Sequence, residues 1–254
     1  MKITMITSAR NGMPYLEQCL ESIVVAAKGL DVEILYADAC STDGSAECAA
    51  RLIGANNVFI EPDDGFGDGV NKVFRRSTGD VFGALPADDL LAPDALRHVS
   101  AAFEANPRAG WGVGLYEIID AEERLIRPLH TTYKNFAIRH FHPWWLMAEN
   151  ILPWVSFFIR REFRLEIGDM ILETECLAND YDYFIRCTKR SRPLIIPHVL
   201  GRWRYHATSN SGSQMRRMSQ DAWKVCRSHT SNPLLLGLNA ICSTRNALLF
   251  DKIG

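Results

Sequence analysis

The chain has 254 residues, of which 47% are hydrophobic and 23% are charged, and its formal net charge is −2. This length suits one large α/β domain, or one domain with an appended lobe, and the composition excludes a disordered protein. The near-neutral charge supplies no long-range attraction to a polyanion, so we expect no nucleic-acid partner.

The first hundred residues alternate between apolar strand patterns and helical patterns. Strands are expected at residues 3–7, 32–36, 58–60 and 81–85. Helices are expected at residues 15–23, in a short segment that follows the polar turn 41–45 and ends at about residue 52, at residues 70–76 and after residue 93. Strict alternation predicts parallel strands joined by right-handed crossovers, with ligands at the carboxyl ends of the strands.

The second half differs in texture. Residues 111–119 and 125–129 are expected to pair as a hairpin across 120–123, residues 153–159 to form a strand, and residues 181–187 to begin a helix. The segment 140–145 carries two histidines and two tryptophans. We favour a packed aromatic cluster there over a zinc site, because no second pair of ligands is evident.

The stretch from Leu234 to Phe250 is the most apolar, but Asn239, Arg245 and Asn246 interrupt it. We expect a partly buried helix, with an amphipathic helix at the inner face of a membrane as the alternative. The seven cysteines form an odd set without a C-x-x-C pair, and the N-terminus has no signal pattern. These features predict free thiols and a cytoplasmic protein.

Acidic residues follow three of the expected strands. Asp38 ends the second strand, Glu61 ends the third, and Asp88 and Asp89 follow the fourth, so these acids should meet at one edge of the sheet. Two adjacent carboxylates favour a nearby cation, and a divalent metal holding a diphosphate is one solution. The alternative is a helix cap. The sequence lacks the glycine patterns of dinucleotide-binding folds and of phosphate loops, so a Rossmann dehydrogenase and a P-loop NTPase are both disfavoured.

Several separated segments then carry longer motifs. They are residues 6–23, which begin I-T-S-A-R-N; residues 33–45, which end in D-A-C-S-T-D-G-S; residues 61–72, E-P-D-D-G-F-G-D-G-V-N-K, with T-G-D at 78–80 and A-D-D at 87–89; residues 179–186, N-D-Y-D-Y-F-I-R; and residues 204–209, R-Y-H-A-T-S. In this order and spacing the chain resembles, over roughly residues 1–210, the family 2 glycosyltransferases. These are inverting enzymes that use nucleotide-diphospho-sugars, and cell-surface polysaccharide transferases of the colanic-acid type are the most similar in pattern.

The resemblance implies the GT-A fold, an α/β fold with a mostly parallel central sheet flanked by helices and a smaller acceptor-side region. It implies a nucleotide-sugar-binding half at 1–110, an acceptor-binding and catalytic half at 111–230, and a C-terminal helical tail at 231–254. The implied reaction moves a sugar from a UDP-sugar, or from a GDP-sugar as the next choice, to a saccharide or lipid-linked oligosaccharide. Peripheral membrane contact and the oligomeric state are left open.

The resemblance also implies roles for single residues. Asp180 is the expected general base, although it stands where a helix dipole would lower its pKa. Asp89 is the expected ligand of Mn²⁺ or Mg²⁺, with His206 completing the coordination. Thr7, Asp38, Asp68, Asp88 and Arg204 are expected to bind the donor nucleotide. Alternative roles are a turn cap for Asp38 and a structural role for His206.

One position departs from the family pattern. Asn179 stands where the family often has glutamate, and Glu173 or Glu175 are the acids that could compensate. Two other functions stay open. The first is that of another enzyme class with a metal-bound diphosphate on an α/β sheet, and the second is kept open by Asn179. One is a sugar-nucleotide nucleotidyltransferase, for which Arg10-Asn11-Gly12 is a poor substitute for a glycine-rich basic loop. The other is a degenerate module that binds a nucleotide or glycan without turnover.

Overall fold

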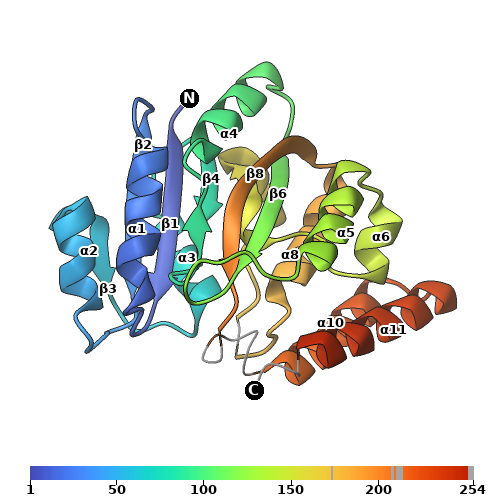
Figure 1. Cartoon of the computed structure of the whole chain (residues 1–254). Helices are drawn as coiled ribbons and strands as arrows, with labels where there is room; N and C mark the ends of the chain where they lie inside the picture. The colour runs from blue at the N-terminus through green and yellow to red at the C-terminus, as the bar shows by residue number, and fades with distance from the viewer. Residues whose placement is uncertain (173, 207–208, 210–213, 251–254) are drawn as a thin grey trace.

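The structure is a computed structural model, and it describes residues 1–172, 174–206, 209 and 214–250. Its centre is one eight-stranded sheet with the strand order β3-β2-β1-β4-β7-β6-β8-β5. The N-terminal half, coloured blue to green in Figure 1, lies on one side of the molecule. The C-terminal helices α10 and α11, orange to red, lie at the opposite side.

The first half follows the expected alternation. In chain order it contains β1 (Ile3–Ala9), α1 (Tyr15–Ala26), β2 (Val32–Asp38), α2 (Ser45–Ile53), a 3₁₀ turn (Ala55–Asn57), β3 (Val58–Ile60), α3 (Phe66–Phe74), β4 (Val81–Ala84), β5 (Leu90–Leu91) and α4 (Ala95–Ala105). β1 lies between β2 and β4 and is parallel to both, while β2 is parallel to β3. The four predicted strands are confirmed.

The second half completes the sheet. It contains β6 (Trp111–Ile119), α5 (Pro128–Arg139), α6 (Pro143–Ala148), a 3₁₀ turn (Trp154–Ser156), β7 (Phe157–Arg160), α7 (Arg161–Ile167), α8 (Asn179–Arg190), β8 (Leu194–Arg204), α10 (Met215–His229) and α11 (Pro233–Phe250). β7 is antiparallel to β4 and β6, and β5 is antiparallel to β8, whereas β6 and β8 are parallel. The sheet is therefore mixed, and the pairing of β4 with β7 joins the two halves in one body.

Two expectations about the second half are wrong. Residues 125–129 do not form a strand: one isolated bridge pairs Ile119 with Leu125, and α5 begins at Pro128. Proline suits the first turn of a helix and cannot donate to a strand ladder, which explains the change. The strand expected at 153–159 is shorter, because a 3₁₀ turn occupies Trp154–Ser156 before β7 begins.

Helix α3 starts earlier than the apolar pattern indicated and runs through two glycines. A Cβ at Gly69 would lie 2.0 Å from Ser8 Oγ and 2.8 Å from Asp63 Oδ2. Only a residue without a side chain lets α3 approach the end of β1 this closely. The glycines of the motif at 65–69 thus bring α3 against the carboxyl end of the sheet.

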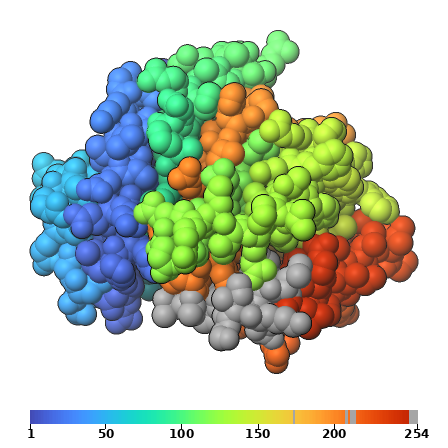
Figure 2. All heavy atoms as spheres, viewed as in Figure 1, coloured from blue at the N-terminus to red at the C-terminus, as the bar shows by residue number. Residues whose placement is uncertain are grey.

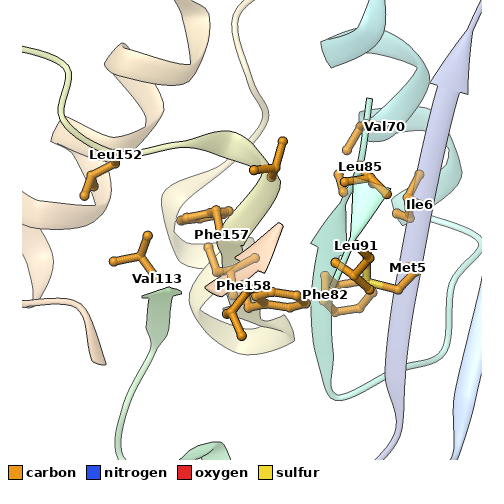
Figure 3. Close-up of a cluster of buried hydrophobic side chains, with 14 of the residues drawn as sticks. Met5, Ile6, Val70, Phe82, Leu85, Leu91, Val113, Leu152, Phe157 and Phe158 are labelled. Carbon is orange, nitrogen blue, oxygen red and sulfur yellow. The ribbon is translucent and has the colours of Figure 1, made fainter. Parts of the chain in front are cut away.

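The core lies where β1, β4 and β7 adjoin. Figure 3 shows Met5 and Ile6 of β1 facing Phe82 of β4 and Leu85, with Phe158 of β7 beside Phe82. All five side chains are buried. A Cβ at Gly83 would come within 2.6 Å of the Phe158 ring, so the glycine lets this ring lie flat against β4.

The C-terminal helices pack against each other and extend from the body (Figure 1). The expected helix at 234–250 is confirmed as α11. Its inner face is anchored by Leu235 and Asn239, which are both buried. Among the helices within the described ranges, none is long and apolar enough to span a bilayer.

Candidate active site

A cavity of about 720 Å³ lies between the carboxyl ends of β1 and β4 and the helices α5, α8, α10 and α11. Its lining includes four of the predicted site residues, which come from two distant parts of the sequence: Asp88, Asp89, Asp180 and His206. The expected general base therefore shares one cavity with the expected metal-binding residues, whereas Asp38 and Glu61 are not among the described residues that line it. Both halves of the chain contribute to one site.

Asp88 and His206 face each other across this cavity wall. Asp88 Oδ2 and His206 Nε2 are 3.1 Å apart, and the Tyr15 ring packs against the imidazole with its centroid 4.7 Å away. The Ser209 hydroxyl donates to the His206 carbonyl at 2.8 Å. The arrangement places one carboxylate and one imidazole at the same point of the cavity.

Asp89 is deeper than its neighbour, with 2% of its surface exposed. Its Oδ1 accepts a hydrogen bond of 2.7 Å from the backbone N–H of Arg204. Burial, and next the charge of Asp88, raise the pKa of Asp89 well above its usual range. The hydrogen bond from Arg204 and its positive charge oppose this rise without cancelling it.

Arg204, which contacts the loop that carries Asp88 and Asp89, is fully buried. Its guanidinium donates to the carbonyl of Asp88, to the carbonyl of Ala121 and to Gln18 Oε1, at 2.8, 3.0 and 2.9 Å. It is not among the described residues that line the cavity. Its observed contacts fix the loop 88–89 against the end of β8.

The donor chemistry at this wall suits a divalent cation. Magnesium and manganese take carboxylate oxygens together with substrate phosphates, and manganese also accepts imidazole. Asp88 and His206 offer one carboxylate and one imidazole within reach of each other, and Asp89 adjoins them. Within the described part of the chain no cluster of three or more such side chains occurs, so an ion here would take further ligands from a bound phosphate or water.

Asp180 lies in the first turn of α8 and lines the opposite part of the cavity. Its Oδ1 accepts from the Tyr181 N–H at 2.6 Å, and its Oδ2 accepts from Asn150 Nδ2 at 3.1 Å. Burial outweighs these hydrogen bonds and raises the pKa of Asp180 to about 6. The expectation that its helix position would lower the pKa is wrong, because desolvation is the larger effect.

Asn179 is buried beside the base and also lines the cavity. Its Nδ2 donates to the Ile171 carbonyl at 3.1 Å, and a Cβ at Gly67 would touch the same amide. The side chain therefore has a defined packing role where α8 meets α3. Of the two acids that could compensate, Glu175 is exposed in a turn and Glu173 lies outside the described residues.

Three predicted nucleotide-binding residues lie next to the cavity, outside the described lining. Thr7 is fully buried, with its hydroxyl 3.9 Å from Cys19 Sγ. Asp68 forms an ion pair with Lys72 at 2.6 Å. Asp38 accepts from the Ser41 N–H at 2.6 Å, which is the turn-capping contact named as its alternative. Its second oxygen is buried and has no hydrogen-bond partner among the described residues.

The polar turn after β2 is tied to the start of the chain. Asp43 Oδ2 accepts from the Met13 N–H at 2.9 Å, and Asp43 Oδ1 accepts from the Ser45 hydroxyl at 2.5 Å. These contacts give Asp43 a structural role in the turn. These bonds hold residues 10–13, which line the cavity, against the turn.

The sequence did not point to a buried charge cluster at the far end of the cavity. Lys134 and Glu149 are each 4% exposed and are joined at 2.5 Å. Glu149 also accepts from Arg245, Asn246 and Tyr133. Burial opposes ionisation, but Lys134 and these donors outweigh it and lower the pKa of Glu149 to about 2. No local motif signals the cluster, because its members come from three separate helical segments.

The aromatic segment packs as predicted. Phe136 contacts the rings of His140 and Trp145, with centroids 4.3 and 6.0 Å away, and His142 Nδ1 accepts from the Trp144 N–H. The packed cluster is confirmed. The tryptophans that line the cavity are Trp154 and Trp203 instead, so this cluster lies beside the site.

Comparison with known proteins gives a family and a fold. The family model described as glycosyl transferase family 2 matches residues 4–165. An uncharacterized protein of Mycobacterium tuberculosis (strain CDC 1551 / Oshkosh), MT1568, is 26% identical over 211 residues, covering 77% of this chain and 65% of that protein. The chain spans 65%, 40% and 23% of the length of three curated relatives.

Two solved structures are similar over nearly the whole chain. TarS of S. aureus, residues 1–349 in complex with UDP-GlcNAc, has 12% identity and a TM-score of 0.68, covering 98% of this chain and 73% of that one. The mannosyltransferase PcManGT of Pyrobaculum calidifontis, in complex with GDP-Man and Mn²⁺, has 18% identity and a TM-score of 0.68, covering 99% and 75%. At such identities the likeness concerns the fold alone, and the expected GT-A fold is confirmed.

Proposed function

Since this chain belongs to glycosyl transferase family 2, we propose that it is an inverting enzyme that transfers a sugar from a nucleotide-diphospho-sugar to a saccharide or lipid-linked acceptor. The observation that carries this proposal is the shared cavity of Asp180 with Asp88 and His206. A proton acceptor and a diphosphate-binding wall are the two parts that inverting transfer needs. We favour a UDP-sugar, with a GDP-sugar next, and a role in surface polysaccharide synthesis at the inner face of the membrane.

The diphosphate of the donor is assigned to the wall formed by Asp88, Asp89 and His206. These residues would hold Mn²⁺ or Mg²⁺, which when bound supplies positive charge to the departing nucleoside diphosphate. Burial and the charge of Asp88 raise the pKa of Asp89 although Arg204 opposes them, and a cation at this wall would stabilise the charged form of this carboxylate. Arg204 keeps the two acids in place through its bonds to both.

The acceptor hydroxyl is assigned to Asp180. One of its carboxylate oxygens takes the hydroxyl proton while the hydroxyl oxygen attacks the anomeric carbon of the donor. The bond from that carbon to the diphosphate oxygen breaks, and the nucleoside diphosphate leaves on the opposite face. A pKa of about 6 suits this step, since Asp180 is ionised near neutral pH and still basic enough to accept a proton.

The nucleobase is assigned to the edge of the sheet beside Asp38. Its buried second oxygen is an acceptor for a uracil or guanine N–H, which supports this role. Thr7 and Asp68 are assigned to the surrounding wall, through their positions on β1 and α3. Access to Asp38 requires the turn at 41–45 to yield slightly, because Asp38 is 1% exposed.

The proposal is tested by a panel of UDP- and GDP-sugars assayed for released nucleoside diphosphate, with Mn²⁺ and with chelator. Metal-dependent release of UDP or GDP that increases with a saccharide acceptor is the expected result. Release of pyrophosphate instead would identify a nucleotidyltransferase. Nucleotide-induced thermal stabilisation without turnover of any donor would identify a binding module.

A further inference from the structure

Helix α11 turns several polar side chains toward the protein and leaves a row of apolar side chains outside, whereas an ordinary surface helix exposes its polar face. Its polar side chains point inward: Asn239, Ser243 and Asn246 all line the cavity. Its outer row consists of Leu234, Gly237, Ile241, Thr244 and Leu248. This outer row carries no charge.

The exposure of the outer row is large. Leu234, Ile241 and Leu248 are 58%, 67% and 61% exposed and recur every seven residues, so they share one face of the helix. Single exposed leucines are common on protein surfaces, but an aligned row without one charged residue is a feature of contact surfaces. In Figure 2 the helix lies at one end of the molecule.

The orientation of α11 is fixed by polar contacts on its inner side. Asn239 is 1% exposed and donates to the Met147 carbonyl and the Tyr181 hydroxyl, at 3.3 and 3.1 Å. Arg245 and Asn246 both donate to the buried Glu149. Turning the leucines inward would break these bonds and leave the buried carboxylate of Glu149 without two of its partners, which would lower stability. The apolar face is therefore held outward.

Helix α10, which packs along α11, adds positive charge to the same end of the molecule. Its exposed cations are Arg216, Arg217, Lys224 and Arg227, and its one acid, Asp221, is buried. Residues 215–250 contain five lysines and arginines and one acid, a formal charge of +4 in a chain whose net charge is −2. The charge of the protein is thus strongly segregated toward the two helices.

We propose that α10 and α11 form a docking surface for an anionic lipid bilayer. The outer leucine row would enter the boundary between headgroups and acyl chains, and the cations of α10 would meet lipid phosphates. A second copy of the chain is the less suitable occupant, because a two-fold contact would bring the exposed cations of two α10 helices together. No spanning segment is needed for this mode of attachment.

The same helices also form a wall of the cavity. Met215, Met218, Asn239, Ser243 and Asn246 line it from α10 and α11. A docked molecule would thus hold its cavity next to the headgroup layer. This position would suit a lipid-linked acceptor, a point that rests on the proposed function. The docking surface itself does not depend on the transfer reaction.

The test is cosedimentation of the full chain with vesicles, without any donor sugar. We expect binding to vesicles of phosphatidylcholine mixed with phosphatidylglycerol and much weaker binding to phosphatidylcholine alone. Ile241→Gln with Leu248→Gln should lower the partition coefficient about tenfold or more. Lys224→Gln with Arg227→Gln should lower it by a similar factor at low salt, and added salt should lower it for the unchanged protein.

Matched controls come from other surfaces of the chain. Leu125 and Leu165 are 63% and 66% exposed, so Leu125→Gln with Leu165→Gln removes the same apolar area elsewhere and should leave binding unchanged. Arg97→Gln with Arg108→Gln is the corresponding control for charge. Equal binding by the variants of α10 and α11 and by the control variants would overturn the proposal.

Self-association is measured on the same samples. A dimer in solution that Ile241→Gln with Leu248→Gln separates, together with no vesicle binding, would assign the surface to a second copy and overturn the proposal. Vesicle binding with no nucleoside diphosphate release from any donor would leave the docking surface standing and reject the proposed function. The two claims therefore fail independently.

Discussion

The side-chain amide of Asn150 donates to Asp180 Oδ2 over 3.1 Å, and both residues line the cavity. With the Tyr181 N–H on the other oxygen, this bond leaves the carboxylate one fixed orientation. A half-buried carboxylate that is already oriented would need little rearrangement when a hydroxyl arrives.

Replacing the base should remove turnover while sparing donor binding. We expect Asp180→Asn to lower kcat about 10²-fold or more, because general-base catalysis contributes on that scale. Nucleotide affinity, measured by calorimetry with UDP and Mn²⁺, should change little. Glu175→Gln, an exposed acid of the preceding turn, is the control. Equal kcat for Asp180→Asn and the unchanged protein would remove Asp180 from the mechanism.

The pH profile should report the same carboxylate. With a pKa of about 6, Asp180 is protonated in acid, so kcat/KM should rise with pH and level off above about 6. The hydrogen bond from Asn150 favours the charged form and lowers this pKa. Asn150→Ala should therefore move the acidic limb to higher pH. A lower rate with an unmoved limb would assign Asn150 a packing role only.

Asp88 and His206 should determine how much Mn²⁺ the reaction requires. Asp88→Asn and His206→Asn should each raise the Mn²⁺ concentration needed for half-maximal activity by about tenfold or more, and chelator should abolish activity. Asp94→Asn, a 75% exposed acid at the start of α4, serves as the control. If chelator leaves the rate unchanged, a metal has no part in the reaction.

The buried pair of Lys134 and Glu149 should matter for stability. Lys134→Met leaves Glu149 buried without its ammonium partner, so the free energy of unfolding should fall by about 3–5 kcal/mol. The double variant Lys134→Met with Glu149→Leu should recover part of this loss. Urea unfolding of the unchanged protein, of Lys134→Met, of Glu149→Leu and of the double variant gives these values, and additive effects in the double variant would show that the pair does not interact.

The same pair predicts an acid-dependent loss of stability. The folded protein lowers the pKa of Glu149 to about 2, below its value in the unfolded chain. Its contribution is therefore complete above the unfolded pKa and is lost as the pH falls from about 4.5 toward 2. The Glu149→Gln protein should show a flatter decline of melting temperature over that interval.

Two glycines allow a matched test of close packing. Gly69→Ala places a methyl group against Ser8 and Asp63, so we expect a loss of about 1–3 kcal/mol in stability. Gly237→Ala meets nothing within 4 Å on α11 and should raise stability by about 1 kcal/mol. Thermal unfolding of both variants, in the same buffer, compares them. Opposite signs are required.

The sequence was most informative where short-range rules decide the structure. The strands of the first half follow from local pattern, and the position of Asp88 and Asp89 after the carboxyl end of β4 follows from the alternation of strands and helices. The predicted meeting of these acids with Asp38 and Glu61 in one cavity lining is not observed among the described residues. Pro128 ended the expected hairpin because one residue changed which element could form. The predicted direction of the pKa shift of Asp180 was wrong, because the prediction considered only its position at the start of a helix. Burial by segments distant in the sequence decides the shift.

The charge cluster around Glu149 marks the limit of such rules. Arg245 and Glu149 are 96 residues apart and Lys134 lies on a third segment, so only the packing of α5, α6 and α11 brings them together. The polarity of α11 is hidden for the same reason. A mostly apolar sequence with a few polar residues does not tell which side of the helix meets the protein.

Arg204 carries a consequence for how a ligand would be received. Its backbone binds Asp89 and its side chain binds the Asp88 carbonyl and Gln18, so the acid loop, the end of β8 and α1 are fastened through one buried residue. Because His206 follows two positions later, the imidazole and the carboxylates keep their spacing before anything enters. The entropic cost of assembling this constellation is met during folding, and an arriving diphosphate would find a preorganised receptor.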